Sequence, residues 1–406
     1  MHGRHVIDRA GYDMHGLPIE VRVENELGFT SKKDIETFGI AEFVEKCRTF
    51  AVTHKEIMSR QFSNLGVWLD FENPYQTISN DYIEAAWFTL KRVEEEGMLE
   101  RGYRVVNWCP RCETAIADAE VEYQDVTDPS IFVKFPLSGA ENEYLVIWTT
   151  TPWTLPANVA VAVAADFTYA RVRAVREGVT EILWIADDLV ESVLKAGRYQ
   201  DYEILGVKKG AELVGTEYTS PLISSVPMQG QIAHRVVAAD FVAMENTGMV
   251  HIAPGHGWDD YVLGMKENLQ IVCPVDGTGR FTEEAGEFAG LYVKDTETNT
   301  NVIHALGSAL LAEKKLSHRY GHCWRCKTPN IFRATSQWFI KASDAKEKML
   351  ASIRDEVTWF PDWAGSARFH DWIEGARDWC ISRQRYWGIP IPVWVCPASV
   401  SYTHLR

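Results

Sequence analysis

The sequence of residues 149–158 is TTTPWTLPAN, a polar stretch between two runs that are typical of β-strands, YLVIW before it and VAVAV after it. Proline lacks the amide hydrogen that strand pairing needs, so Pro152 and Pro156 indicate that the chain leaves a sheet here and exposes its hydroxyl groups. When this segment is taken alone, an edge strand with a proline turn explains it equally well.

A second polar cluster follows about a hundred residues later, HIAPGHGWDD, in which His251, His256, Asp259 and Asp260 stand among glycines and a proline. A carboxylate in such a loop can hold an ammonium group through charge-assisted hydrogen bonds, while the threonine hydroxyls position a water beside a small polar ester. A lone His251 is more simply a hydrogen-bonded residue at a strand end. Its pairing with Asp260 and the threonines favours a functional site.

The composition is that of a globular protein. At 406 residues the chain is long enough for two or three domains with their own cores, and its 46% hydrophobic and 24% charged residues are ordinary. It has no apolar run long enough to span a bilayer and no secretory signal at its N-terminus, so we expect a cytoplasmic protein without a membrane partner. The formal charge of −15 argues against broad coating by nucleic acid but leaves room for a local basic patch.

Four of the eight cysteines form two C-x-x-C pairs, Cys109 with Cys112 and Cys323 with Cys326. In a reducing compartment such pairs are metal sites or redox pairs, and two pairs together match one tetrahedral zinc site with four thiolate ligands. Two independent reduced pairs are the alternative. Two further cysteines in apolar surroundings, Cys47 and Cys273, are expected to be inert core thiols.

Apolar periodicity and end signals predict two helices in the first part of the chain. One covers residues 41–66, and the other is capped by Asn80 or Asp81 and ended by Gly97. From about 127 to 320 short β-branched runs dominate, which indicates an inserted β-rich domain. Because the cysteine pairs flank this insertion, a shared zinc would fix the two strands that enter and leave it.

Six motifs, in chain order, resemble the isoleucyl-tRNA synthetase family of class I aminoacyl-tRNA synthetases: GYDMHGLPIEVRVENELG, WCPRCETAIADAEVEY, WTTTPWTLPANVAVAV, NTGMVHIAPGHGWDDY, HCWRCKTPNIFRATSQWF and WCISRQRYWGIPIPVW. Valyl and leucyl relatives share the architecture, but they usually carry an arginine where this chain has Thr151. The four-cysteine pattern is similar to the archaeal and eukaryotic-type branch.

The resemblance implies an α/β fold: part of a class I nucleotide-binding, Rossmann-like catalytic domain, interrupted by a β-rich, barrel-like editing domain with a zinc knuckle at the junction. Residues 1–126 would hold the first catalytic part and first zinc half-site, and residues 127–320 the editing domain. The second half-site and the return to the catalytic domain would occupy 321–395, and 396–406 would be an aberrant or truncated tail.

The implied activity is that of an isoleucine–tRNA ligase, which charges tRNA with isoleucine at the cost of ATP and hydrolyses mischarged valyl-tRNA. Its implied partners are tRNA for isoleucine, isoleucine and ATP with Mg²⁺, its structural metal is zinc, and it would act as a monomer. Isoleucine and valine differ by one methylene, worth about 1–3 kcal/mol in a hydrophobic pocket, for which this synthetase family is itself the standard example. A second, hydrolytic site is therefore needed.

By resemblance, each candidate residue has a role. Asp260 would hold the α-ammonium of the misactivated amino acid, and His251 would form the wall that excludes isoleucine. The terminal ribose and the hydrolytic water would be oriented by Thr149, Thr150, Thr151 and Asn158. In the synthetic half, Asp13 would bind the ammonium of isoleucine at the carboxyl edge of a parallel sheet; taken alone, Asp13 is more simply a turn residue.

Several departures from the family pattern lead us to expect an incomplete chain. The family's HIGH signature should precede Met1, and its KMSKS loop and anticodon-binding domain should follow Arg406, so synthesis is expected only in a longer parent. Ser399 stands where a second knuckle near Cys396 should have its partner cysteine, and SVSYTHLR matches nothing in the pattern. The competing hypotheses are a free-standing deacylase of mischarged tRNA, a valyl-type synthetase and a zinc-stapled RNA-binding module without catalysis.

Overall fold

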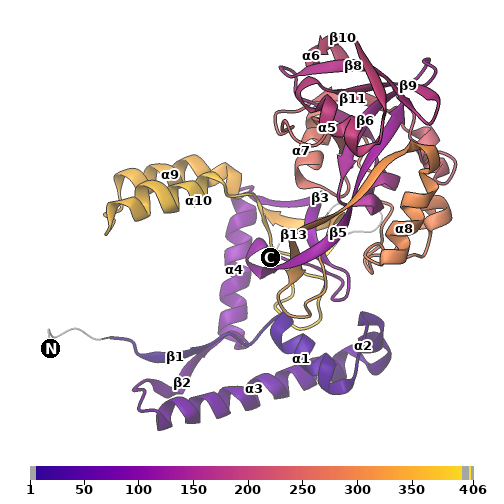
Figure 1. Ribbon diagram of the computed structural model, residues 1–406. Coiled ribbons are helices and arrows are strands. Elements are labelled where there is room, and N and C mark those ends of the chain that lie inside the picture. The colour runs from indigo at the N-terminus through magenta and orange to yellow at the C-terminus, as the bar shows by residue number, and fades with distance from the viewer. Residues whose placement is uncertain (1–5, 396–401, 404–406) are drawn as a thin grey trace. The chain divides into compact units, whose positions relative to one another are not determined.

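A computed structural model describes residues 6–395 and 402–403, so Cys396 and Ser399 lie outside the described residues. The chain divides into two compact units (Figure 1). Residues up to Gly102 and from Ser336 onward form one, called here the flanking unit, and Tyr103–Thr335 form the other, the inserted unit. The inserted unit is longer at both ends than the insertion expected from the sequence, and it contains both cysteine pairs.

The flanking unit begins with a parallel strand pair and three helices. Strand β1 (Arg9–Tyr12) pairs with β2 (Asp70–Gln76), and α1 (Leu17–Leu27), α2 (Lys32–Phe38) and α3 (Ile40–Asn64) lie between them in sequence. The helix predicted over residues 41–66 is confirmed as α3. Its apolar stripe buries Phe43, Cys47 and Ala51, and the complete burial of Cys47 raises the pKa of its thiol to about 12, as an inert core thiol requires.

Helix α4 (Asn80–Glu95) confirms the second predicted helix but corrects its cap. The N-cap is Ser79, whose Oγ accepts a hydrogen bond from the Tyr82 amide at 3.3 Å, rather than Asn80 or Asp81, which are the first two helical residues. A serine hydroxyl at this position satisfies one of the amides that the first turn leaves free. Gly97, with φ at 69°, ends the helix region as predicted.

The later part of the flanking unit is short-helical. It contains the 3₁₀ helix η7 (Ala342–Ala345), α9 (Lys346–Asp355), the π-helical turn η8 (Ala364–Phe369), α10 (His370–Glu374), and strands β15 (Trp379–Cys380), β16 (Trp394–Val395) and β17 (Tyr402–Thr403). Residues 381–388, ISRQRYWG, form no helix or strand. They are held as a loop by side-chain contacts.

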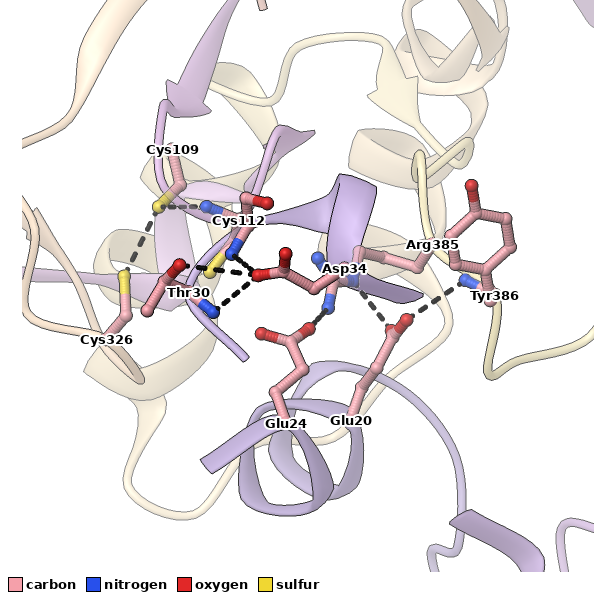
Figure 2. Close-up of polar contacts among 10 residues, drawn as sticks. Glu20, Glu24, Thr30, Asp34, Cys109, Cys112, Cys326, Arg385 and Tyr386 are labelled. Carbon is pink, nitrogen blue, oxygen red and sulfur yellow. Dashed lines mark hydrogen bonds and ion pairs between the residues drawn. The ribbon is translucent and has the colours of Figure 1, made fainter. Parts of the chain in front are cut away.

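One buried cation holds this loop against α1 (Figure 2). Arg385 lies between two buried carboxylates, with its Nε 2.6 Å from Glu20 Oε2 and its Nη2 paired with Glu24. The Tyr386 amide also donates to Glu20, at 3.2 Å. A buried charge is tolerated only when it is paired, so removing Arg385 would leave two carboxylates without their cation.

The inserted unit is built on a six-stranded sheet in the order β10-β8-β9-β6-β5-β13. Its strands are β5 (Val121–Pro136), β6 (Glu143–Thr149), β8 (Thr168–Arg176), β9 (Val179–Ala186), β10 (Asp201–Lys209) and β13 (Leu310–Cys323). Strands β6 and β9 pair in parallel, and the other neighbours are antiparallel. Within the described residues the order is that of an open sheet with β10 and β13 at its edges.

A second sheet of three strands carries part of the candidate site. Its order is β11 (Arg235–Ala238), β7 (Ala160–Val163) and β12 (Met249–Ile252). All four residues of β7 are buried, because a strand covered on both faces is apolar throughout and does not alternate.

The remaining elements of the inserted unit are short. They are β4 (Thr114–Ala115), η1 (Asp118–Glu120), η2 (Pro152–Ala157), η3 (Asp187–Leu189), α5 (Val190–Ala196), α6 (Gly210–Leu213), η4 (Pro227–Gln231), α7 (Trp258–Glu267), η5 (Glu283–Phe288), α8 (Thr296–Ala305) and η6 (Gly307–Ala309). Strands β3 (Leu99–Cys109) and β14 (Ile331–Ile340) carry the chain across the unit boundaries. Among the described residues, no helix combines the length and apolar character needed to cross a membrane.

Candidate functional site

The stretch TTTPWTLPAN leaves the six-stranded sheet as predicted. Strand β6 ends at Thr149, and η2 begins at Pro152. The sequence predicts that these hydroxyl groups are exposed, and this prediction is wrong in part: Thr149 is buried, and Thr150 and Thr151 are half-buried. The turn η2 that follows them is buried along its whole length.

The threonines line a cavity of about 320 Å³ within the inserted unit. Five of the six residues expected to edit mischarged tRNA line it together: Thr149, Thr150, Thr151, His251 and Asp260. Ten further lining residues were not predicted as site residues, and those with polar or aromatic side chains are Trp148, Thr154, Phe241, Glu245, Asn246 and His256. Thr154 and His256 had a sequence signal, because Thr154 lies in TTTPWTLPAN and His256 lies in HIAPGHGWDD.

Both ring nitrogens of His251, on β12, have partners. Nε2 lies 2.9 Å from Thr154 Oγ1, and Nδ1 lies 3.5 Å from Asn158 Nδ2. Since the Thr154 hydroxyl donates to the Thr151 carbonyl at 2.8 Å, it accepts from His251, whose proton is therefore on Nε2. Burial, and then the nearby His256, lower the pKa of His251 to about 4. The ring is a neutral part of the cavity wall.

The sixth expected residue, Asn158, is not among those that line the cavity. It is fully buried, and its Oδ1 accepts from the Tyr218 hydroxyl at 2.7 Å while its Nδ2 donates to the Ala160 carbonyl at 3.0 Å. Its remaining contact is with His251 Nδ1. The structure therefore places Asn158 behind the histidine, where it can hold the ring but is not exposed to the cavity.

Asp260 lies in the first turn of α7, next to the cavity. Its Oδ2 accepts from the Ala253 amide at 2.9 Å, and a Cβ at Gly257 would come within 2.9 Å of its carboxylate, so this approach requires glycine. Burial raises the pKa of Asp260 to about 7, opposed by the Ala253 amide and increased by the charge of Asp259. A cation beside this desolvated carboxylate would stabilise its charged form.

His256 is buried and lines the same cavity. Its Nδ1 lies 3.0 Å from the Phe332 carbonyl, whereas its Nε2 is buried without a hydrogen-bond partner among the described protein atoms. Its ring packs edge-on against Trp153 with centroids 5.1 Å apart. Burial lowers the pKa of His256 to about 4. The ring is therefore neutral at physiological pH.

A separate cluster brings the four predicted cysteines together. The Sγ atoms of Cys109, Cys112, Cys323 and Cys326 all lie within 4.8 Å of one another, and those of Cys109 and Cys326 are 3.4 Å apart (Figure 2). A tetrahedral zinc with Zn–S bonds of ~2.3 Å needs sulfur atoms about 3.8 Å apart. The four side chains are free thiols with donor chemistry suited to zinc, so they fit this metal.

The four thiols share hydrogen bonds with one another. Hydrogen bonds from the other thiols lower the pKa of Cys326 and lower that of Cys323 to about 7, and the same contacts raise the pKa of Cys109. The pKa of Cys112 is raised as well, so two of the thiols keep their protons more firmly and two release them more easily; a bound zinc would replace the protons on all four. The Cys112 amide donates to Cys109 Sγ at 3.3 Å, as amides of cysteine knuckles do.

Asp13 belongs to the flanking unit and follows the carboxyl end of β1 directly. It is exposed, and its Oδ1 accepts from the His15 amide at 3.4 Å. Next to it, the Gly16 amide donates to the Trp387 carbonyl and Trp387 Nε1 donates to the Met14 carbonyl. The segment after β1 is thus fixed by the 381–388 loop while the Asp13 carboxylate faces solvent.

The sequence model of the protein family described as tRNA synthetases class I (I, L, M and V) matches residues 1–402 of this chain. Among curated proteins, the isoleucine–tRNA ligase of Methanocorpusculum labreanum is 72% identical over 99% of this chain and 38% of its own length. The ligases of Methanoregula boonei and Methanosarcina acetivorans are 70% and 60% identical, over 99% and 98% of this chain and 37% of each relative. The chain thus spans less than two fifths of the length of these relatives.

Two solved structures of leucyl-type proteins are also similar. GlLeuRS-CP1 is 14% identical with a TM-score of 0.35, covering 45% of this chain and 97% of that one. The ternary complex of Agrobacterium radiobacter K84 agnB2 LeuRS with tRNA and LeuAMS is 15% identical with a TM-score of 0.33, covering 100% of this chain and 43% of that one.

Proposed function

Since the chain belongs to the class I tRNA synthetases for isoleucine, leucine, methionine and valine, we propose that it is part of an isoleucine–tRNA ligase whose inserted unit hydrolyses valyl-tRNA. In this proposal the inserted unit is the editing domain, and the flanking unit belongs to the synthetic domain. The observation that carries the proposal is the convergence of threonine hydroxyls, a neutral histidine wall and a carboxylate on one cavity.

Asp260 is the proposed anchor for the substrate's α-ammonium group. Its carboxylate accepts from the backbone amide of Ala253 and is desolvated by burial. A cation placed there would form a charge-assisted hydrogen bond that is stronger than it would be in water. This contact fixes the amino acid end of the ester and so aligns its carbonyl carbon with the threonine side of the cavity.

The threonine side supplies hydroxyl groups for the ribose and for a water. Thr149 Oγ1 already accepts from the Thr151 amide at 3.1 Å, which holds the turn in place and leaves Thr150 and Thr151 half-exposed to the cavity. Holding a water and an ester in reactive contact removes much of the entropic barrier to their reaction. An aminoacyl ester is reactive enough for this positioning to give a useful rate.

His251 is the proposed size limit. Its ring is neutral and both nitrogens are bonded to protein groups, so it presents carbon atoms and not a base to the cavity. Close-packed walls discriminate against one added methylene because it has nowhere to go. Asn158 and Thr154 would support this role by holding the ring from behind.

The rest of the proposed ligase makes use of the other sites. A zinc held by Cys109, Cys112, Cys323 and Cys326 would supply structural rigidity where β3 and β13 end. Asp13, at the end of a parallel strand, is placed where α/β folds bind small ligands and is the proposed contact for the isoleucine ammonium. ATP with Mg²⁺ and tRNA for isoleucine would be the partners of the whole ligase.

Deacylation by the purified chain tests the proposal. We expect release of valine from valyl-tRNA carrying the isoleucine anticodon well above the spontaneous rate, with isoleucyl-tRNA largely spared. Equal, spontaneous rates for both esters would contradict it. A zinc-stapled binding module without catalysis predicts tRNA binding without hydrolysis, and the shared cavity argues against that alternative.

A further inference from the structure

We propose that His256 accepts the hydrogen bond, and then the proton, of the attacking water in the inserted unit, through its Nε2 atom. The inference rests on the proposed editing function. It adds a base to a site in which the resemblance assigned the water to three threonine hydroxyls and the Asn158 amide. Four observations carry it: the tautomer of the ring, its unpartnered nitrogen, its place in the cavity and the exclusion of the other histidine.

The tautomer of His256 follows from its backbone partner. A carbonyl oxygen can only accept, so Nδ1, 3.0 Å from the Phe332 carbonyl, carries the proton and donates. In a neutral imidazole the other nitrogen then holds a lone pair. Nε2 is therefore an acceptor, fixed in direction by a backbone contact from β14, 76 residues away in sequence.

That acceptor has no protein partner. Nε2 is buried and forms no hydrogen bond with any described protein atom, which is unusual for a buried polar atom. The neighbouring Trp153 has a buried indole N–H that is likewise without a partner among these atoms. Buried polar atoms without a protein partner are few in native structures, and a bound water or a catalytic role accounts for such an atom.

The position of His256 matches the chemistry. It lines the same cavity as Asp260 and Thr150, and it precedes Asp260 by four residues in one short segment. The group that would hold the ammonium and the group that would hold the water are thus on one short segment of chain. His251 cannot take this part, because both of its nitrogens already have partners.

The proposed hydrolysis has two steps, addition of the water and loss of the ribose oxygen. The water gives a proton to His256 Nε2 as its oxygen bonds to the ester carbonyl carbon, and the electron pair of the C=O bond moves to the carbonyl oxygen. When the tetrahedral intermediate collapses, the bond to the ribose oxygen breaks and that oxygen takes the proton back from Nε2. The products are the free amino acid and tRNA with its terminal hydroxyl restored.

The electrostatic surroundings keep the lone pair free. Burial lowers the pKa of His256 to about 4, with the Phe332 carbonyl opposing this and Arg333 adding to it. The other titratable groups that line the cavity are Glu245, His251 and Asp260. Nε2 is therefore unprotonated near neutral pH, and proton transfer to it accompanies bond formation at the carbonyl carbon.

Two substitutions separate catalysis from packing. In His256→Gln the amide oxygen reaches about as far as Nε2, so the acceptor is kept while the donor to Phe332 is lost. In His256→Asn the amide nitrogen replaces Nδ1, so the bond to Phe332 is kept while the acceptor is lost. Single-turnover deacylation of valyl-tRNA, measured over a range of enzyme concentrations, gives the maximal rate and the half-saturating concentration separately.

We expect His256→Asn to lower the maximal rate at least tenfold with half-saturation changed less than twofold. His256→Gln should lower it less than His256→Asn does but by more than threefold, because an amide oxygen can hold the water but cannot take its proton. A His256→Gln rate within about threefold of the unsubstituted protein would overturn the proton transfer. The reverse order would show a packing role, and an effect on half-saturation alone would show a contact with a ribose hydroxyl; either overturns the proposal. His318→Asn, which alters a histidine paired with Asp128 outside the cavity, is the control. Lack of hydrolysis by the unsubstituted protein would instead contradict the editing function itself.

Discussion

Thr154 Oγ1 and His251 Nε2 lie 2.9 Å apart and join the turn that follows β6 to strand β12. The two residues are 97 positions apart in sequence. Because Thr154 passes its own hydrogen to the Thr151 carbonyl, it can only accept from the histidine, and the ring cannot flip without breaking this bond. The wall of the cavity is therefore a fixed surface.

Replacing His251 by alanine should enlarge the cavity. We expect isoleucyl-tRNA to become a substrate, with its hydrolysis raised roughly tenfold or more, because exclusion of one methylene is worth about 10–200-fold. Hydrolysis of valyl-tRNA should largely survive, and parallel deacylation assays of the two esters measure both effects. If both activities disappear, the histidine is structural or catalytic and the size limit must be assigned elsewhere.

Replacing Thr154 by valine should release the ring without changing the volume of the wall. The lost hydrogen bond is worth about 0.5–1.5 kcal/mol, so we expect the preference for valyl-tRNA over isoleucyl-tRNA to fall about two- to tenfold. Thr154→Ser keeps the hydroxyl and is the matched control. A valine variant with unchanged preference would show that packing alone holds His251.

Replacing Asp260 by asparagine should remove the charge that holds the ammonium. An unpaired buried cation costs about 1–3 kcal/mol or more, and one decade in rate is about 1.4 kcal/mol, so deacylation of valyl-tRNA should slow at least tenfold. Asp259→Asn is the control, because Asp259 is adjacent, exposed and absent from the cavity lining. Equal effects of the two substitutions would point to a general change in charge.

The pH dependence should report Asp260. Its pKa of about 7 means that the protonated, uncharged form dominates below neutrality, so kcat/KM for valyl-tRNA should fall as the pH drops from 8 to 6. His251 and His256, with pKa values of about 4, add no change in this range. After correction for spontaneous hydrolysis, kcat/KM of Asp260→Asn should not change between pH 6 and pH 8. A pH dependence that persists in this variant would belong to another titratable group.

The same carboxyl group has a predictable effect on stability. Its pKa is raised above its ordinary value, so between about pH 4 and 7 the folded protein binds more protons than the unfolded chain, and the free energy of unfolding contributed by Asp260 decreases as the pH rises. In denaturant unfolding at pH 5 and pH 7.5, the free energy of unfolding should fall less, or rise more, with pH in Asp260→Asn than in the unsubstituted protein.

The cysteine cluster should bind one zinc per chain. Cys323→Ser leaves three thiolates and should lower both the zinc content and the melting temperature, whereas Cys273→Ser, at a half-buried cysteine outside the cluster, should leave the zinc content unchanged. Metal analysis after gel filtration, followed by thermal unfolding, measures both. Full zinc content in Cys323→Ser would contradict the four-thiolate site.

Local pattern was enough to predict much of the fold. The run YLVIW is β6, VAVAV contains β7, and the helix over 41–66 is α3, because burial of a continuous apolar run or stripe is recorded in adjacent residues. The prediction of the N-cap of α4 was wrong because Ser79, Asn80 and Asp81 are all good capping residues, and only the backbone conformation selects Ser79.

The site was predictable in its residue types but not in its contacts. The threonines, His251 and Asp260 converge on one cavity, as the two polar clusters suggested. The place of Asn158 depends on Tyr218, and the tautomer of His256 depends on a carbonyl at Phe332. Such contacts join residues distant in sequence, and no local periodicity records them.

Strands β5 and β13 pair antiparallel, from Val121 opposite Cys323 to Val133 opposite Leu310. This pairing closes a long loop of the chain, and loop closure has an entropic cost. The two ends of a long excursion are held side by side, and the cysteines at its base, 217 positions apart, are in contact. The entropy of closing such a loop grows only with the logarithm of its length, by about 0.6 kcal/mol per doubling. The entropic cost of closing the loop therefore depends little on how many residues lie beyond the β5–β13 pair. Inserted domains of very different length can evolve at this one position.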